Sequence, residues 1–166
     1  MFTNIEAIIN NAVKQKEQEI AQIAEDTMWA VLNRNKSYYT RQLRSFVDQL
    51  YYGQFAPSDS YDRTGMFKNS AYCKPYREGK IMGLEIGFDT NKLYFVFPSV
   101  KGNYASYGSF VPKEKGGGYE ALSEAGKEWV VDQLEGRAQI IEAFTDWFND
   151  DFNDKFNTLL SQRLSR

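Results

Sequence analysis

Histidine is absent from this 166-residue chain, and cysteine occurs once, as Cys73. Without histidine the chain lacks the commonest general base and the commonest metal ligand, which excludes serine–histidine, cysteine–histidine and histidine–zinc chemistry. A single cysteine cannot form an internal disulfide or a thiolate cluster, and this usage fits a reducing compartment. The sequence therefore predicts no histidine-based active site, no metal site and no cofactor.

Long apolar segments are missing as well. No unbroken apolar run is longer than Leu93–Phe97, whereas a membrane-spanning helix needs ~20 such residues. The N-terminus has neither the basic start nor the continuous apolar segment of a secretory signal. We therefore expect a protein made in the cytoplasm, with no membrane among its partners.

The composition that remains is that of an ordinary globular chain, with 42% apolar, 25% charged and 16% aromatic residues. Its length predicts a single domain over 1–166. The net charge of −2 excludes a uniformly basic nucleic-acid surface. Residues 1–80 carry 11 basic and 9 acidic side chains, and residues 81–166 carry 9 and 13. Such opposite signs suit head-to-tail association of identical copies.

Helical periodicity dominates both ends of the chain. Apolar residues spaced by three and four from Ile5 to Leu32 predict a helix over about 4–33, a polar break at 33–37, and a second helix over about 38–52. The same spacing predicts helices over about 119–135, stopped by Gly136, and 137–164. The first helix is expected to pack its stripe against the aromatic C-terminal helix, although a two-stranded coiled coil is an alternative use of that stripe.

The middle of the chain has the pattern of strands and turns. Residues 65–98 predict a β region, in which the alternating segment 80–88 pairs with 93–97 through a tight reversal at 89–92. Residues 66–76 are expected to add a further strand. Residues 99–118, rich in Gly, Ser, Tyr and Lys, predict a long loop. The fold class that follows is α+β, with a long N-terminal helix, a small antiparallel β-sheet and a long C-terminal helix.

Two charged clusters invite functional hypotheses. Basic residues without acidic neighbours occur between Thr27 and Val47, interleaved with Tyr38 and Tyr39: Arg34, Lys36, Arg41 and Arg44. Basic plus aromatic side chains contact phosphates and bases, so a single-stranded nucleic-acid-binding module is one alternative, and an oligomer interface fits equally well. The second cluster comprises acids of the C-terminal helix: Asp146, Asp150, Asp151 and Asp154. Their spacing indicates a solvated helix face rather than a metal site.

An enzyme that uses carboxylates alone is a third hypothesis. It would require two facing acids in a concave pocket, as in a glycosidase, and the acids of this sequence are expected on helix exteriors. We therefore expect no catalytic activity.

The segment from Tyr61 to Ser70 reads Y-x-R-T-G-x-F-x-x-S. It follows the N-terminal helices and precedes the predicted hairpin. At such a corner a glycine permits backbone conformations that other residues resist, and a threonine hydroxyl can bond nearby backbone groups. In sequence and position it resembles the Y-x-R-T-G-x-L-x-x-S segment of the tail-completion or neck proteins of tailed bacteriophages. The residues that carry the resemblance form either a corner or an interface motif: Tyr61, Arg63, Thr64, Gly65, Phe67 and Ser70.

The resemblance implies a structural virion protein and no catalysed reaction. Such a protein is made in the host cytoplasm and resides in the virion, where copies form a homo-oligomeric ring at the head–tail junction. The ring joins the portal and its adaptor to the tail, and DNA passes through it without sequence-specific binding. This chain lacks the histidine-containing stretch that often follows the hairpin in the family, so its layer in the neck stays open.

Overall fold

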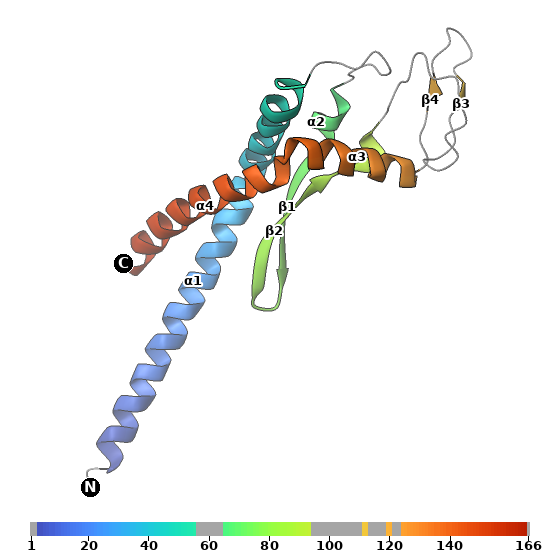
Figure 1. The fold of residues 1–166 in the computed structure, drawn as a ribbon. Coiled ribbons are helices and arrows are strands. Elements are labelled where there is room, and N and C mark those ends of the chain that lie inside the picture. The colour runs from blue at the N-terminus through green and yellow to red at the C-terminus, as the bar shows by residue number, and fades with distance from the viewer. Residues whose placement is uncertain (1–2, 56–64, 94–110, 113–118, 121–123, 166) are drawn as a thin grey trace.

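A computed structural model describes residues 3–55, 65–93, 111–112, 119–120 and 124–165 (Figure 1). It confirms the α+β class, with a long helix at each end and antiparallel strands between them. The elements in chain order are α1 (Thr3–Phe46), η1 (Val47–Tyr52, π-helical), α2 (Met66–Ser70), β1 (Ala71–Glu78), β2 (Ile81–Phe88), η2 (Thr90–Lys92, 3₁₀), β3 (Val111–Pro112), β4 (Tyr119–Glu120), α3 (Glu124–Ala138) and α4 (Ile140–Leu164).

Helix α1 is continuous, so the break expected at 33–37 is wrong. Asn35 satisfies its own amide by donating from Nδ2 to the Val31 carbonyl oxygen at 2.8 Å. Leu32 and Tyr39, on either side of the polar stretch, are fully buried, and burial of large side chains outweighs weak helix propensity. The expected end of the helical segment is confirmed, because η1 stops at Tyr52 and the Gly53 amide donates to the Asp48 carbonyl oxygen.

The hairpin forms between β1 and β2, which pair antiparallel from Ala71↔Phe88 to Glu78↔Ile81. The segment expected to pair with 80–88, residues 93–97, lies outside the described residues except for Leu93, which is not in a strand; at the expected reversal, residues 90–92 form a 3₁₀ turn. The expected strand over 66–76 is also corrected, because residues 66–70 are helical and only 71–76 belong to β1.

Tyrosine rings packed on glycines fit the pairing of β1 with β2. A Cβ atom on Gly83 would lie 2.7 Å from Tyr76 Oη, and one on Gly87 would lie 2.9 Å from Tyr72 Oη. The two rings thus occupy the space that the glycines leave free on the cross-strand neighbour. Tyr72 and Tyr76 share one face of β1, and their spacing matches that of Gly87 and Gly83 in β2.

Helix α3 begins and ends later than the sequence indicates, whereas α4 begins later but ends at Leu164 as expected. Residues 119–120 pair with 111–112 as β4 and β3, so the expected 99–118 loop contains a strand and the expected helix start at 119 is wrong. The rest of 94–118 lies outside the described residues. Helix α3 passes through Gly136 and ends at Ala138, because the break is made by Gln139, whose φ of 51° is left-handed.

The hydrophobic core lies where α1 packs against α4 on one side and the hairpin on another. Aromatic rings form much of it: Tyr39 is 4.9 Å from Phe148 between centroids, and the fully buried Phe144 packs edge-on against Phe46 at 5.9 Å. The expected packing of α1 against the C-terminal helix is confirmed for this part of α1, which includes the buried Val31, Tyr39 and Leu43.

The N-terminal part of α1 leaves the body of the protein. Residues 5–22, which we call the arm, are all exposed, and Figure 1 shows this end of α1 extending away from the other labelled elements. The intramolecular use of the apolar stripe is therefore wrong for the arm. None of the described helices combines the length and apolarity needed to cross a bilayer.

Candidate functional site

The described half of the Tyr61–Ser70 segment forms the corner between η1 and the hairpin; Tyr61, Arg63 and Thr64 lie outside the described residues. Gly65 has φ 73° and ψ 0°, and its carbonyl oxygen accepts from the Asn69 amide. Phe67 is buried and stacks on Phe88 with centroids 4.5 Å apart. Gly65 and Phe67 therefore serve to turn the chain and to anchor the corner in the core.

Ser70 closes the corner from the strand side. It is fully buried, its Oγ donates to the Phe67 carbonyl oxygen at 2.8 Å, and its own carbonyl oxygen accepts from the Asp89 amide at 2.9 Å. The Asn69 carbonyl oxygen accepts from the Arg44 guanidinium at 3.1 Å. Ser70 thus links α2 to the residue that follows β2, and Asn69 links α2 to α1.

The four basic residues of α1 do not form one patch. Arg34 and Arg41 are seven residues apart and share a face of the helix, whereas Lys36 lies on another face at 100° per residue. Arg44 belongs to the corner through its bond to Asn69. Arg34 and Arg41 therefore lie on one side of α1 and Lys36 on another, while Arg44 is held at the corner.

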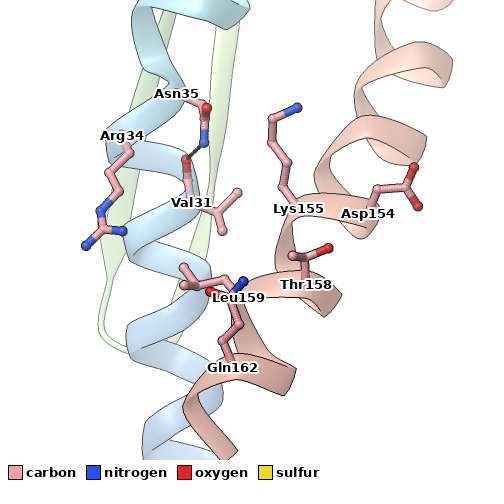
Figure 2. A pocket seen from close by; sticks show the side chains of 8 residues that line it. All are labelled: Val31, Arg34, Asn35, Asp154, Lys155, Thr158, Leu159 and Gln162. Carbon is pink, nitrogen blue, oxygen red and sulfur yellow. Dashed lines mark hydrogen bonds between the residues drawn. The ribbon is translucent and has the colours of Figure 1, made fainter.

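A groove runs between α1 and the C-terminal half of α4, close to Arg34 (Figure 2). It encloses about 400 Å³, and its walls mix apolar, amide and charged side chains. Figure 2 shows Lys155 and Thr158 facing the Val31 turn of α1, while Arg34 extends away on the far side of α1. The residues lining the groove are Val31, Arg34, Asn35, Asp154, Lys155, Thr158, Leu159 and Gln162.

A polar cluster closes one end of this groove. Asp151, on α4, accepts a hydrogen bond from Tyr38 Oη at 3.3 Å and from the Lys155 ammonium. The same ammonium lies 4.7 Å from the centre of the Tyr38 ring. The Asp151 side chain is only 15% exposed, so its charge requires these two partners. The cluster joins the two long helices.

Tyr39 is fully buried beside this cluster. Burial, reinforced by the neighbouring Asp151 carboxylate, raises the pKa of Tyr39 well above its ordinary value of 10.0. Burial likewise raises the pKa of the Cys73 thiol to about 12, so that thiol stays protonated and unreactive at neutral pH.

These two groups predict a loss of stability at alkaline pH. Both are neutral when protonated and have raised pKa values in the folded state. Above the ordinary values of 9.0 for Cys73 and 10.0 for Tyr39, the unfolded chain therefore holds fewer protons than the folded chain. We expect the free energy of unfolding, measured in urea from about pH 8 to pH 11, to fall as pH rises through this range. Tyr39→Phe should make the fall shallower, and a slope equal to that of the wild type would contradict the role of Tyr39.

The acidic side chains of α4 occupy the positions that the sequence indicates. Asp146, Asp150 and Asp154 are exposed, and only Asp151 turns into the helix interface. Among the residues that the structure describes, no group of His, Cys, Asp or Glu is arranged to hold a metal ion. A second hollow of about 420 Å³ on the hairpin contains Tyr72 hydrogen-bonded to Glu85 at 2.9 Å. This hydrogen bond is the main reason that the pKa of Tyr72 is raised.

The rings of Tyr38 and Tyr39, the tyrosines considered for base stacking, pack against other side chains of the same subunit. Tyr39 packs edge-on against Phe148 and Trp147, and Tyr38 packs against Trp147 at 5.9 Å while Lys155 covers its ring. A stacking platform needs ring faces open to solvent, which these two residues do not offer.

Sequence reasoning did not single out the Asp151–Lys155 pair. The i, i+4 spacing of an acid and a base on a predicted helix was the available signal, but such spacing is common on solvated helices. Comparison of the chain with models of known families, with curated proteins and with solved structures finds no match.

Proposed function

We propose that the protein is a structural virion protein of a tailed bacteriophage. Copies of it form a ring at the head–tail junction, in the neck or tail-completion position, and join the portal and adaptor to the tail. DNA crosses the ring without sequence-specific binding. The protein is made in the host cytoplasm, carries no cofactor and catalyses no reaction.

The observation that carries this proposal is the segment Tyr61–Ser70, with its likeness to the family motif, at the passage from helix to hairpin. Its described residues occupy positions where the choice of amino acid is restricted: Gly65 has a left-handed backbone conformation, and Phe67 and Ser70 are buried. The order of a long helix, this corner, a hairpin and a long C-terminal helix is the order that the resemblance implies.

The distribution of exposed apolar side chains supports an assembly role. Besides the arm, Ile81 at the hairpin turn is 66% exposed. A protein that works as part of a larger shell covers such side chains with its neighbours. The nucleic-acid alternative receives less support, because Tyr38 and Tyr39 are packed internally and Lys36 and Arg44 do not share the face of Arg34.

A conditional knockout tests the proposal. In a phage that carries this gene with an early amber codon, infection of a non-suppressing host should yield DNA-filled heads and separate tails by negative-stain electron microscopy. Supplying the intact gene in trans should restore joined particles. Joined, infectious particles in normal yield without the protein would overturn the proposal. Salt-dependent binding of single-stranded oligonucleotides by the purified monomer would favour the nucleic-acid alternative instead.

A further inference from the structure

The edge of β1 in the hairpin is closed. In an antiparallel ladder, residue pairs that exchange backbone hydrogen bonds alternate with pairs whose N–H and C=O groups point outward. The Cys73 amide donates to Thr40 Oγ1 of α1 at 3.2 Å, so Cys73 and its partner Ile86 form an outward-pointing pair. The alternation places Pro75, which has no N–H, in an outward position as well. Helix α1 and a proline therefore occupy this edge.

The edge of β2 is open. By the same alternation, its outward-pointing backbone groups belong to Met82, Leu84 and Ile86. These groups make no hydrogen bond to any residue that the structure describes, and all three residues are partly exposed. The turn end of the hairpin stands clear of α3 and α4 (Figure 1). The N–H and C=O groups of this edge are thus left for water or for a further strand.

Strand β2 also lacks the features that protect an exposed edge. Edge strands of soluble proteins are very short or carry lysine, proline or an inward-pointing charge, because a long apolar edge pairs with other chains. β2 is eight residues long and contains neither lysine nor proline. Its side chains on the core side are all apolar, and its one charged residue, Glu85, lies on the opposite side of the sheet. Such an edge is a template for strand addition.

A second copy of this chain can supply the added strand only through its own β2. Head-to-tail pairing of β2 with β1 is excluded, because α1 and Pro75 close the β1 edge. Among the other described strands, β3 and β4 have only two residues each. Pairing of β2 with β2 uses the same surface on both copies, as a two-fold interface requires.

We propose that β2 pairs antiparallel with β2 of a second copy, across a two-fold axis at Leu84, so that the two hairpins form one continuous sheet. Outward-pointing residues then face each other, and Met82 comes level with Ile86 of the second copy. About six backbone hydrogen bonds cross the axis. An axis at Glu85 would give an overlap of the same length, but it would set two glutamates directly opposite each other, which is destabilising.

The charges of β2 fit this register. Glu85 lies opposite Gly83 of the second copy and therefore faces no charge directly. Its carboxylate accepts from Tyr72 Oη at 2.9 Å, and that Oη would lie 2.9 Å from a Cβ atom on Gly87. The carboxylate is thus held toward Gly87, away from the axis and from Glu85 of the second copy.

The same register covers Ile81, which is 66% exposed at the turn end of β2. It comes opposite Gly87 of the second copy, the glycine over which the Tyr72 ring packs. Side chains at pairs that exchange no backbone hydrogen bonds approach most closely, and a β-branched side chain against an aromatic ring is a favourable cross-strand contact. Each copy therefore buries the exposed Ile81 of the other.

This pairing goes beyond the proposed virion role and does not depend on it. A ring closes through heterologous contacts, whereas the β2–β2 contact is isologous and joins copies in twos. Absence of the pairing would leave the ring proposal standing. A phage that assembles normally without the protein would leave the pairing standing.

Sedimentation equilibrium of the full chain tests the pairing. Between about 1 and 100 µM the wild type should show a reversible step that doubles the mass. Met82→Pro removes an outward N–H from each copy and should weaken that step by at least about tenfold. The hairpin keeps its own hydrogen bonds in this variant, as it does at Pro75. A wild type without the step would overturn the proposal.

Met82→Ala is the matched control, because it shortens the same side chain but retains the N–H. It should weaken the doubling step less than Met82→Pro does, and circular dichroism should show that both variants are folded. Equal weakening by the two variants would overturn the proposal, since the backbone of Met82 would then have no part in the contact.

Hydrogen exchange read by mass spectrometry at residue resolution locates the contact. The amides of Gly83 and Glu85 point to β1 and should be protected at every concentration, whereas those of Leu84 and Ile86 should be protected only where the mass has doubled. Protection of Leu84 and Ile86 in the monomer would show that this chain covers its own edge. Doubling without their protection would place the contact elsewhere. Either result would overturn the proposal.

Disulfide trapping tests the direction of the pair. In a Cys73→Ser background, Met82→Cys and Ile86→Cys proteins should cross-link when mixed under oxidising conditions and should not cross-link separately. The Cα atoms of such a hydrogen-bonded pair lie ~5.5 Å apart, within the reach of a disulfide. Efficient cross-linking of Met82→Cys with itself would show a parallel pair and overturn the proposal.

Discussion

Replacing Asp151 with alanine should lower the free energy of unfolding by about 2 kcal/mol. The substitution removes the acceptor of two hydrogen bonds, from Tyr38 Oη and from the Lys155 ammonium. It also leaves that ammonium, which is 34% exposed, without its counter-charge between the two long helices. The expected loss is smaller than the ~3–5 kcal/mol of a fully buried pair because both side chains retain some contact with water. Urea denaturation at pH 7 measures it.

The neighbouring Asp150 supplies the control. It is exposed on the same helix, so Asp150→Ala should change the free energy of unfolding by less than about 0.5 kcal/mol. The double variant Asp151→Leu/Lys155→Leu should recover part of the loss, because it removes the unpaired charge as well as the pair. Equal effects of Asp151→Ala and Asp150→Ala would show that the cluster does not stabilise the α1–α4 contact.

Replacing Gly65 with valine should cost about 1–3 kcal/mol of stability. Its φ of 73° lies in the left-handed region, which β-branched residues adopt with strain. A Cβ atom at this position would meet no other atom within 4 Å, so the loss comes from the backbone and not from a clash. Thermal unfolding followed by circular dichroism measures the change.

Asparagine at the same position distinguishes backbone strain from any other cause. Asn tolerates the left-handed region better than other residues with a side chain, so Gly65→Asn should retain most of the stability that Gly65→Val loses. If valine left the melting temperature unchanged, or if both variants lost equal stability, the conformational role of Gly65 would be wrong.

The fold could be predicted from the sequence where the spacing of apolar side chains within one segment determines both its secondary structure and its buried face. The aromatic stripe of α4, including Phe144 and Phe148, indicated both the helix and its buried side, because only one face carries large apolar groups. The prediction failed where distant residues decide. Asn35 reads as a helix breaker until the burial of Leu32 and Tyr39 is known, and burial depends on α4 and the hairpin.

The hairpin illustrates the same limit. Alternation at Leu84 and Ile86 indicated a strand but not its partner, since the rings of Tyr72 and Tyr76 fit over glycines on the neighbouring strand.

At the candidate site, the basic cluster was predicted because its four residues lie close together in the sequence. In the helix these residues lie on different faces. The Tyr38–Asp151 hydrogen bond joins residues that are 113 positions apart in the sequence, and a pattern of neighbouring residues cannot predict such a contact.

The continuity of α1 has a kinetic consequence for its free end. Starting a helix is the unfavourable step, since several residues must be fixed for the first hydrogen bond, whereas each later residue adds a bond as it is fixed. Because α1 runs unbroken from the core into the arm, the folded body supplies the initiated helix. The free end needs only to extend it, so fraying and re-forming there should be faster than formation of the same segment as a separate peptide.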